Sequence, residues 1–105
     1  MKPRDYIRTR LGTLELLAGL AEEASELSQA ALKLRRAYDG KNVTPVSHEE
    51  AYEKLLEEIA DVELCVSMLD VHKPSIEDIK NRKQARWVCR LEAADERKTV
   101  PENRQ

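Results

Sequence analysis

The sequence predicts an all-α protein, in which an antiparallel helical hairpin is followed by a third long helix. Leu, Ala, Glu, Lys and Arg are abundant, and 41% of the residues are hydrophobic while 36% are charged. This mixture favours helices, and Gly and Pro are few. The length of 105 residues suits one domain. We therefore expect a single helical domain over residues 1–98 and a flexible tail over residues 99–105.

The first long helix is expected from about Leu11 or Thr13 to about Tyr38, with a short helical turn before it over residues 3–10. Gly40 lies just beyond this segment and is a typical helix stop. Apolar residues recur every three or four positions and predict one buried stripe. The stripe consists of Leu16, Leu17, Leu20, Ala24, Leu27, Ala31 and Leu34.

The second helix follows a loop over residues 39–47, which is rich in turn-forming residues. Ser47 with Glu50 three positions later matches a capping box, so Ser47 is the expected N-cap. We expect the helix to continue to about Val71. Its apolar stripe consists of Ala51, Leu55, Ile59, Val62, Val66 and Leu69.

The third helix is expected from a cap at Ser75 to about Arg97, because Lys73-Pro74 breaks the preceding pattern. His72 and His48 lie at helix ends, where we interpret them as surface or capping residues. The apolar stripes are broader than a three-helix monomer can cover. We therefore expect a homodimer or homotetramer that completes a four-helix-type bundle.

Charge and cysteine usage exclude several classes of function. The net charge of −2 gives no sign of nucleic-acid binding, but residues 13–72 hold 13 acidic and 5 basic side chains, whereas each flank carries a net charge of +3. Cys65 and Cys89 lie in helical patterns without metal-type spacing, so we expect reduced core thiols in a cytoplasmic protein. Glu15 and Glu22 interrupt the leucine-rich run near the start, so neither a signal peptide nor a membrane span is expected.

Two pairs of acidic residues point to a metal site. Glu23 and Glu26 are spaced i, i+3 on the first helix, and Glu58 and Asp61 are spaced i, i+3 on the second. At 1.5 Å per residue, the first pair lies about 20 Å from the loop and the second about 17 Å. In an antiparallel hairpin, the four carboxylates would therefore face one another at one level.

The second pair also lies on an apolar stripe, because Glu58 and Asp61 share a helix face with Cys65 and Met68. Partly buried carboxylates must be protonated or bind a cation. Oxygen ligands suit a hard ion such as Mg²⁺, or Mn²⁺ in its place. The alternative is that these acids are solvated on exposed faces, because single ExxE patterns are common in acidic helices.

The segments "EEASEL" and "EEIADVEL" resemble the EExxE…ExxD signature of the MazG-like all-α nucleoside triphosphate pyrophosphohydrolases and their dimeric dUTPase relatives. The resemblance covers roughly residues 11–91. It implies Mg²⁺-dependent cleavage of a nucleoside triphosphate between the α- and β-phosphates, giving a monophosphate and pyrophosphate. The implied metal ligands are Glu23, Glu26, Glu58 and Asp61, and Glu22 or Glu57 would orient or deprotonate the attacking water.

The third helix adds a basic segment, "KQARWVCRL", that resembles the one often following these acidic motifs. Its residues Lys83, Arg86 and Arg90 share a helical face and are the implied phosphate-binding groups. Lys33 and Arg36 are lesser candidates, whose expected role is to keep an exposed face soluble. The chain departs from the family in one respect, because the 31 residues between Glu26 and Glu58 exceed the usual spacing.

Two other functions fit the sequence. Phosphoribosyl-ATP pyrophosphatase has a similar size and similar acidic motifs. A helical oligomerisation or adaptor protein without enzymatic activity would carry the same acids as solvated side chains. Binding of a divalent ion separates the two enzymes from the adaptor, and the nucleotide that releases pyrophosphate separates the two enzymes.

Overall fold

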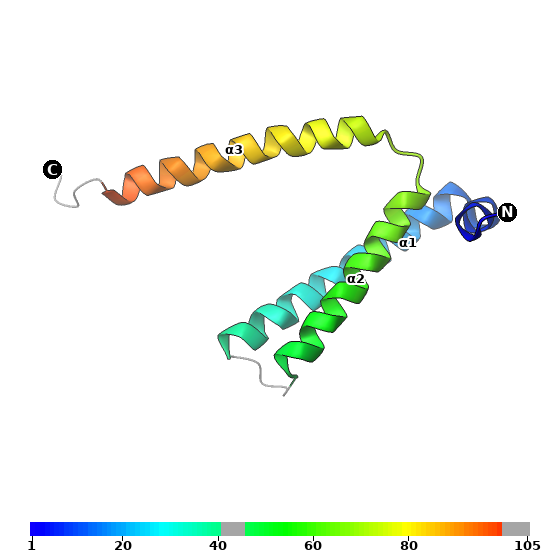
Figure 1. Cartoon of the computed structure of the whole chain (residues 1–105), viewed down its shortest axis with the longest axis horizontal. Coiled ribbons are helices and arrows are strands. Elements are labelled where there is room, and N and C mark those ends of the chain that lie inside the picture. The colour runs from blue at the N-terminus through cyan, green and yellow to red at the C-terminus, as the bar shows by residue number, and fades with distance from the viewer. Residues whose placement is uncertain (41–45, 100–105) are drawn as a thin grey trace. The chain divides into compact units, whose positions relative to one another are not determined.

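A computed structural model describes residues 1–40 and 46–99, and these residues form three α-helices and no strand: α1 (Pro3–Asp39), α2 (His48–Met68) and α3 (Lys73–Thr99) (Figure 1). The all-α prediction is therefore confirmed. Met1–Val71 form one compact unit, and His72–Gln105 form a second. Across the described ranges, no helix is both long and apolar enough to cross a membrane. Residues 41–45 of the predicted loop and 100–105 of the predicted tail lie outside the described residues.

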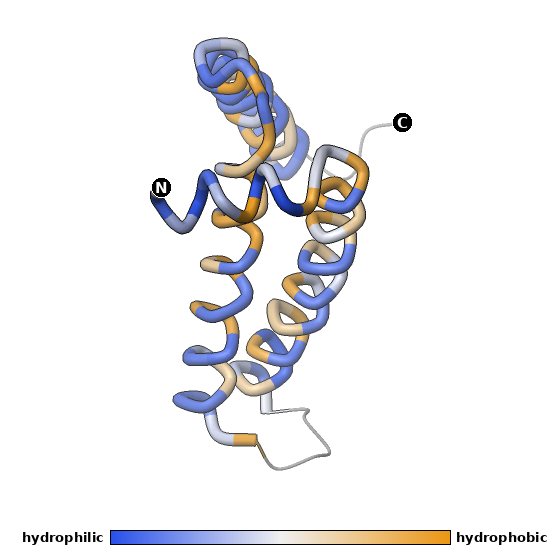
Figure 2. The backbone as a smooth tube through the Cα atoms, turned by 90° about the vertical axis from the view of Figure 1, so that its right-hand side faces the viewer, coloured by the Kyte–Doolittle hydropathy of each residue, from blue (hydrophilic) through white to orange (hydrophobic). Residues whose placement is uncertain are grey.

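The first unit is a hairpin in which α1 and α2 run side by side in opposite directions, as Figures 1 and 2 both show. Leu16, Ala30 and Leu34 of α1 are buried against the hairpin partner. Ala51 and Met68 of α2 are buried from the other side. One charged residue, Glu58, is buried among these apolar side chains. The hairpin core is therefore small and contains a carboxylate.

The buried face of α1 is narrower than the predicted stripe, because it contacts a single partner helix. Leu16 and Leu34 are buried as predicted, but Ala30 is buried in place of the predicted Ala31. Leu17, Ala24 and Ala31 of the predicted apolar stripe are exposed within one chain. On α2, Ile59 is likewise 36% exposed. The predicted stripes thus include positions that face away from the hairpin.

The predicted helical turn before the first long helix is present, and a break at Gly12 separates the two. Gly12 has φ 79° and ψ 170°, a backbone conformation that glycine adopts with little strain. Pro3 occupies the first turn, where its missing N–H is not needed. The Arg4 guanidinium donates a hydrogen bond to the Ser67 carbonyl of α2, so the N-terminal segment is tied to the end of the hairpin.

The capping predictions for the hairpin are confirmed. The Ser47 hydroxyl accepts a hydrogen bond from the Glu50 backbone N–H at 3.1 Å, which fixes the start of α2. Gly40 ends α1 in the left-handed region, with φ 70°. At its other end, α2 stops at Met68 and not at the predicted Val71, since Leu69 is already extended (φ −85°, ψ 150°).

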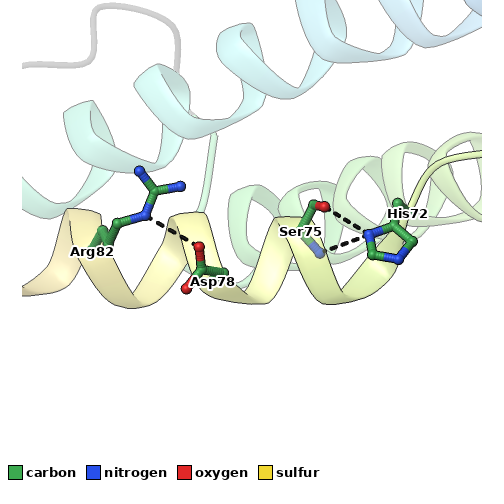
Figure 3. Close-up of polar contacts among 4 residues, drawn as sticks. All are labelled: His72, Ser75, Asp78 and Arg82. Atoms are coloured by element: carbon green, nitrogen blue, oxygen red, sulfur yellow. Dashed lines mark hydrogen bonds and ion pairs between the residues drawn. The ribbon is translucent and has the colours of Figure 1, made fainter.

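The predicted Ser75 cap of α3 is wrong by three residues. The helix begins at Lys73, and the His72 imidazole Nδ1 accepts a hydrogen bond from the Ser75 backbone N–H at 3.2 Å (Figure 3). The Ser75 hydroxyl lies 2.6 Å from the same nitrogen. His72 is thus a capping residue, as predicted, and Pro74 falls in the first turn, where proline is tolerated.

Apart from Ala93 and Ala94, the described side chains of α3 are exposed. Cys89 is among them, so its predicted place in a core is wrong within this chain, whereas Cys65 on α2 is half-buried. Ion pairs one turn apart run along the helix, including Arg82–Asp78 at 3.3 Å (Figure 3) and Lys80–Glu77 at 2.9 Å. Pairs of this kind support an exposed helix by a few tenths of a kcal/mol each, about 0.2–0.5.

Candidate metal centre

Three carboxylates converge between the two helices of the hairpin. Glu23 and Glu26 come from α1 and Glu58 comes from α2, and one oxygen from each lies within 4.8 Å of the others. The i, i+3 spacing places the first two on one face of α1, and the antiparallel packing brings Glu58 to the same height. We call these three residues the carboxylate cluster. The cluster joins residues that are distant in sequence. The similar distances of the two acidic pairs from the loop predicted that these residues would meet.

Two oxygens of the cluster are buried without a hydrogen-bond partner in the described structure, Oε2 of Glu23 and Oε2 of Glu58. Glu58 is only 2% exposed. Its other oxygen, Oε1, lies 3.0 Å from the Lys54 ammonium. A buried polar atom without a partner carries a desolvation cost of about 1–3 kcal/mol, more when the group is charged. These two oxygens are therefore arranged to accept a cation or a proton.

The electrostatics of the cluster indicate a shortage of positive charge. Burial, and then the charges of Glu26 and Asp61, raise the pKa of the Glu23 carboxyl above its ordinary value. Burial, followed by the charges of Glu23 and Asp61, also raises the pKa of the Cys65 thiol. In contrast, the hydrogen bond and charge of Glu58 raise the pKa of the Lys54 ammonium. Negative charge thus accumulates around Glu23, and a cation bound there would offset it.

The donor set fits a hard divalent ion. All three cluster residues offer carboxylate oxygens, and Oε2 of Glu23 and Oε2 of Glu58 are buried without a hydrogen-bond partner among the described residues. Mg²⁺ and Mn²⁺ prefer oxygen ligands, whereas zinc prefers histidine and cysteine. The carboxylate cluster is therefore the group of residues that would hold the ion implied by the motif.

The structure places the other predicted acids around the cluster. Asp61 is half-buried, and its charge acts on Glu23, but it is not one of the three residues whose oxygens converge. Its role as a fourth ligand stays a prediction. Glu22 is exposed, and Glu57 has a side chain that is 69% exposed and lies 3.6 Å from Lys54. The predicted roles of Glu22 and Glu57 toward water also stay predictions.

A groove of about 430 Å³ adjoins the cluster within the hairpin. This volume lies in the range of small-ligand sites, roughly 300–1,000 Å³. Glu26 and Glu58 line both the groove and the cluster. The remaining lining residues are Gln29, Ala30, Leu32, Lys33, Arg36 and Lys54. A groove with carboxylates on one side and three basic side chains beside them suits a ligand that carries both a metal ion and phosphates.

Sequence reasoning gave Lys33 and Arg36 a minor role and did not consider Lys54. Lys54 lies one helical turn before Glu58, a spacing that is also typical of an ordinary surface ion pair. What distinguishes this pair is the burial of Glu58, which becomes visible only when the two helices pack. The signal in the sequence for this burial was the position of Glu58 on an apolar stripe.

The predicted phosphate-binding residues Lys83, Arg86 and Arg90 belong to the second unit. They line a shallow hollow along one face of α3 together with Trp87 and Leu91. Their shared face agrees with their sequence spacing. Their role toward phosphate stays a prediction.

No family model matches the chain, and comparisons with curated proteins and with solved structures also found no match.

Proposed function

We propose that this chain is a divalent-metal-dependent nucleoside triphosphate pyrophosphohydrolase, which converts an NTP or dNTP to the monophosphate and pyrophosphate. The observation that carries the proposal is the carboxylate cluster, in which Glu23, Glu26 and Glu58 converge from two helices. In the described structure, Glu23 and Glu58 each also have one buried oxygen without a hydrogen-bond partner. The adjoining groove with its basic residues supports it. The EExxE…ExxD pattern, in which the same acids appear, also supports it.

In this proposal Glu23, Glu26 and Glu58 hold Mg²⁺, with Asp61 as a further ligand. The bound ion supplies neutralisation of phosphate charge and a water of lowered pKa. Glu26 and Glu58 also line the groove, so they fix where the reacting phosphate lies relative to the cluster. Glu22 or Glu57, both exposed, accepts the proton of the attacking water.

The negative charge of a triphosphate must be balanced by basic side chains as well as by the ion. Lys33 and Arg36 line the groove from α1 and provide such groups next to the cluster. Lys83, Arg86 and Arg90 on α3 keep the phosphate-binding role that the motif implies for them. Charge-assisted hydrogen bonds of this kind are roughly twice as strong as neutral ones.

Self-association is part of the proposal, because the hairpin leaves large apolar side chains exposed. Leu14 is 81% exposed, Leu17 and Leu56 are 48% exposed, and Leu64 is 52% exposed. We infer that a second copy of the chain covers these faces and completes a four-helix-type bundle, as a dimer or tetramer.

The test is release of pyrophosphate from a panel of nucleoside and deoxynucleoside triphosphates, with phosphoribosyl-ATP included, in the presence of Mg²⁺. Glu26→Gln and Asp61→Asn should each abolish turnover, because an amide is a poorer ligand for a hard cation than a carboxylate. Glu63→Gln, an exposed acid of α2 outside the cluster, should keep full activity.

Helical content, measured by circular dichroism, should be the same in all three variants. Full activity in both Glu26→Gln and Asp61→Asn would refute the site assignment. Release of pyrophosphate from phosphoribosyl-ATP alone would replace the proposed substrate class with the histidine-pathway type of substrate.

A further inference from the structure

Lys54 lies where the carboxylate cluster meets the groove. Its ammonium nitrogen is 3.0 Å from Oε1 of Glu58 and 3.6 Å from Oε2 of the exposed Glu57. Lys54 also lines the groove beside Lys33 and Arg36. One side chain therefore contacts a predicted metal ligand and borders the space predicted to hold phosphate.

In the absence of a divalent ion, Lys54 supplies the positive charge next to Glu58. That carboxylate is 2% exposed, and a buried charge without a counter-ion is strongly unfavourable. A divalent ion held by the cluster would bind the same carboxylate. An ammonium at Oε1 and a dication at Oε2 of one carboxylate repel each other, so each cation weakens the binding of the other.

The two partners of this ion pair differ in exposure. The Lys54 side chain is 57% exposed, whereas the Glu58 side chain is 3% exposed. A lysine carries its charge on a flexible four-carbon stem. The same groove is lined by Lys54, Lys33 and Arg36.

We propose that Lys54 exchanges partners: it neutralises Glu58 in the metal-free protein, and on metal binding it leaves Glu58 and binds a phosphate of the substrate in the groove. This inference rests on the proposed function and adds a residue that the motif does not contain. Lys33 and Arg36 on α1 and Lys54 on α2 then bind the phosphates from both helices of the hairpin.

The exchange makes metal and phosphate binding cooperative. Binding of the ion releases Lys54 from Glu58, so Lys54 can bind the phosphate. Binding of the phosphate holds Lys54 in the groove, so Lys54 no longer opposes binding of the ion at Glu58. Because the coupling of two binding equilibria is reciprocal, each ligand must tighten the binding of the other by the same factor, typically about 5–150-fold.

The test compares Lys54→Met with Lys80→Met, a matched control that also breaks a lysine–glutamate pair within one helix, at 2.9 Å and with a 59% exposed lysine. Calorimetry measures the affinity for Mn²⁺ alone, and then for inorganic tripolyphosphate with Mg²⁺ in excess. Lys54→Met should bind Mn²⁺ about fivefold or more tighter and tripolyphosphate weaker by a similar factor. Lys80→Met should match the wild type in both.

A second variant, Lys54→Arg, keeps the positive charge and covers the case in which Lys54→Met does not fold. Arginine binds a carboxylate through two parallel N–H donors, so it should hold Glu58 more firmly and weaken Mn²⁺ binding. Mn²⁺ binding to Lys54→Arg that equals or exceeds that of the wild type would overturn the exchange.

The exchange is also overturned if Lys54→Met binds Mn²⁺ no more tightly than the wild type, or binds tripolyphosphate equally well. Failure of the proposed function gives a different result. In that case the wild type itself binds no Mn²⁺ and releases no pyrophosphate. If the wild type does both and Lys54→Met behaves identically, only the partner exchange is lost.

Discussion

At the scale of single residues, the hairpin keeps two acids where apolar side chains would pack better. Glu58 lies in the face of α2 that also buries Ala51 and Met68, and Glu23 lies half-buried opposite it. Replacing a buried charge by an apolar residue of similar size is often neutral or stabilising. Retaining two such acids with unpartnered oxygens is a cost to the fold that a bound cation would offset.

The raised pKa of Glu23 makes stability depend on pH in the metal-free protein. Because the folded state holds this proton more tightly than the unfolded chain, the contribution is fully present below the ordinary pKa of glutamate in the unfolded chain and is lost as the pH rises through the higher folded value. Glu23→Gln should abolish that part of the pH dependence and raise the melting temperature at pH 7 in EDTA.

Thermal unfolding in EDTA between pH 4 and pH 8 measures this effect, and Glu22→Gln serves as the control because Glu22 is an exposed neighbour. If both variants show the pH dependence of the wild type, Glu23 is not the group responsible.

The residues of the site differ in how far the sequence predicted them. Burial of Glu58 followed from its place on a stripe with Cys65 and Met68, and this prediction is confirmed. The burial of Glu23 was harder to predict, because the apolar stripe includes the adjacent Ala24. In the structure Ala24 is exposed and Glu23 is half-buried. Lys54 was missed, since a lysine one turn from a glutamate resembles an ordinary surface pair until the helices pack.

At the scale of elements, capping side chains set the register that brings the carboxylates together. Ser47 begins α2, and Glu58 follows it after three helical turns at a fixed height along α1. Local signals of this kind are readable in the sequence, and the starts and stops of the hairpin were predicted within a few residues. The cap of α3 was predicted three residues too late, because both His72 and Ser75 are competent caps and Pro74 fits a first turn equally well.

The cap at Ser47 gives a prediction for the stability of the hairpin. Ser47→Ala leaves the Glu50 N–H without its acceptor and should lower the free energy of unfolding by about 1 kcal/mol. Ser47→Asp should be close to the wild type, since aspartate is an equally good N-cap. Urea unfolding followed by circular dichroism measures both, and a Ser47→Ala variant as stable as the wild type would show that the cap is not needed.

At the scale of the whole molecule, the two units carry opposite charge. Residues 1–71 hold 14 acidic and 9 basic side chains, a net charge of −5, whereas residues 72–105 hold 6 acidic and 9 basic side chains, a net charge of +3. The sequence predicted the three helices because helix periodicity is local. Periodicity does not specify what contacts the exposed apolar side chains, such as Leu14 and Leu64.

The central claim is that the carboxylates of α1 and α2 together hold a divalent ion, and the melting temperature with and without Mg²⁺ tests it most directly. At an ion concentration 100 times the dissociation constant, binding stabilises the folded state by about 2.7 kcal/mol. The wild type should therefore melt several degrees higher in Mg²⁺ than in NaCl of equal ionic strength, and Glu58→Gln should lose most of that shift. An identical melting temperature in both salts for the wild type, or a full shift in Glu58→Gln, would contradict the account.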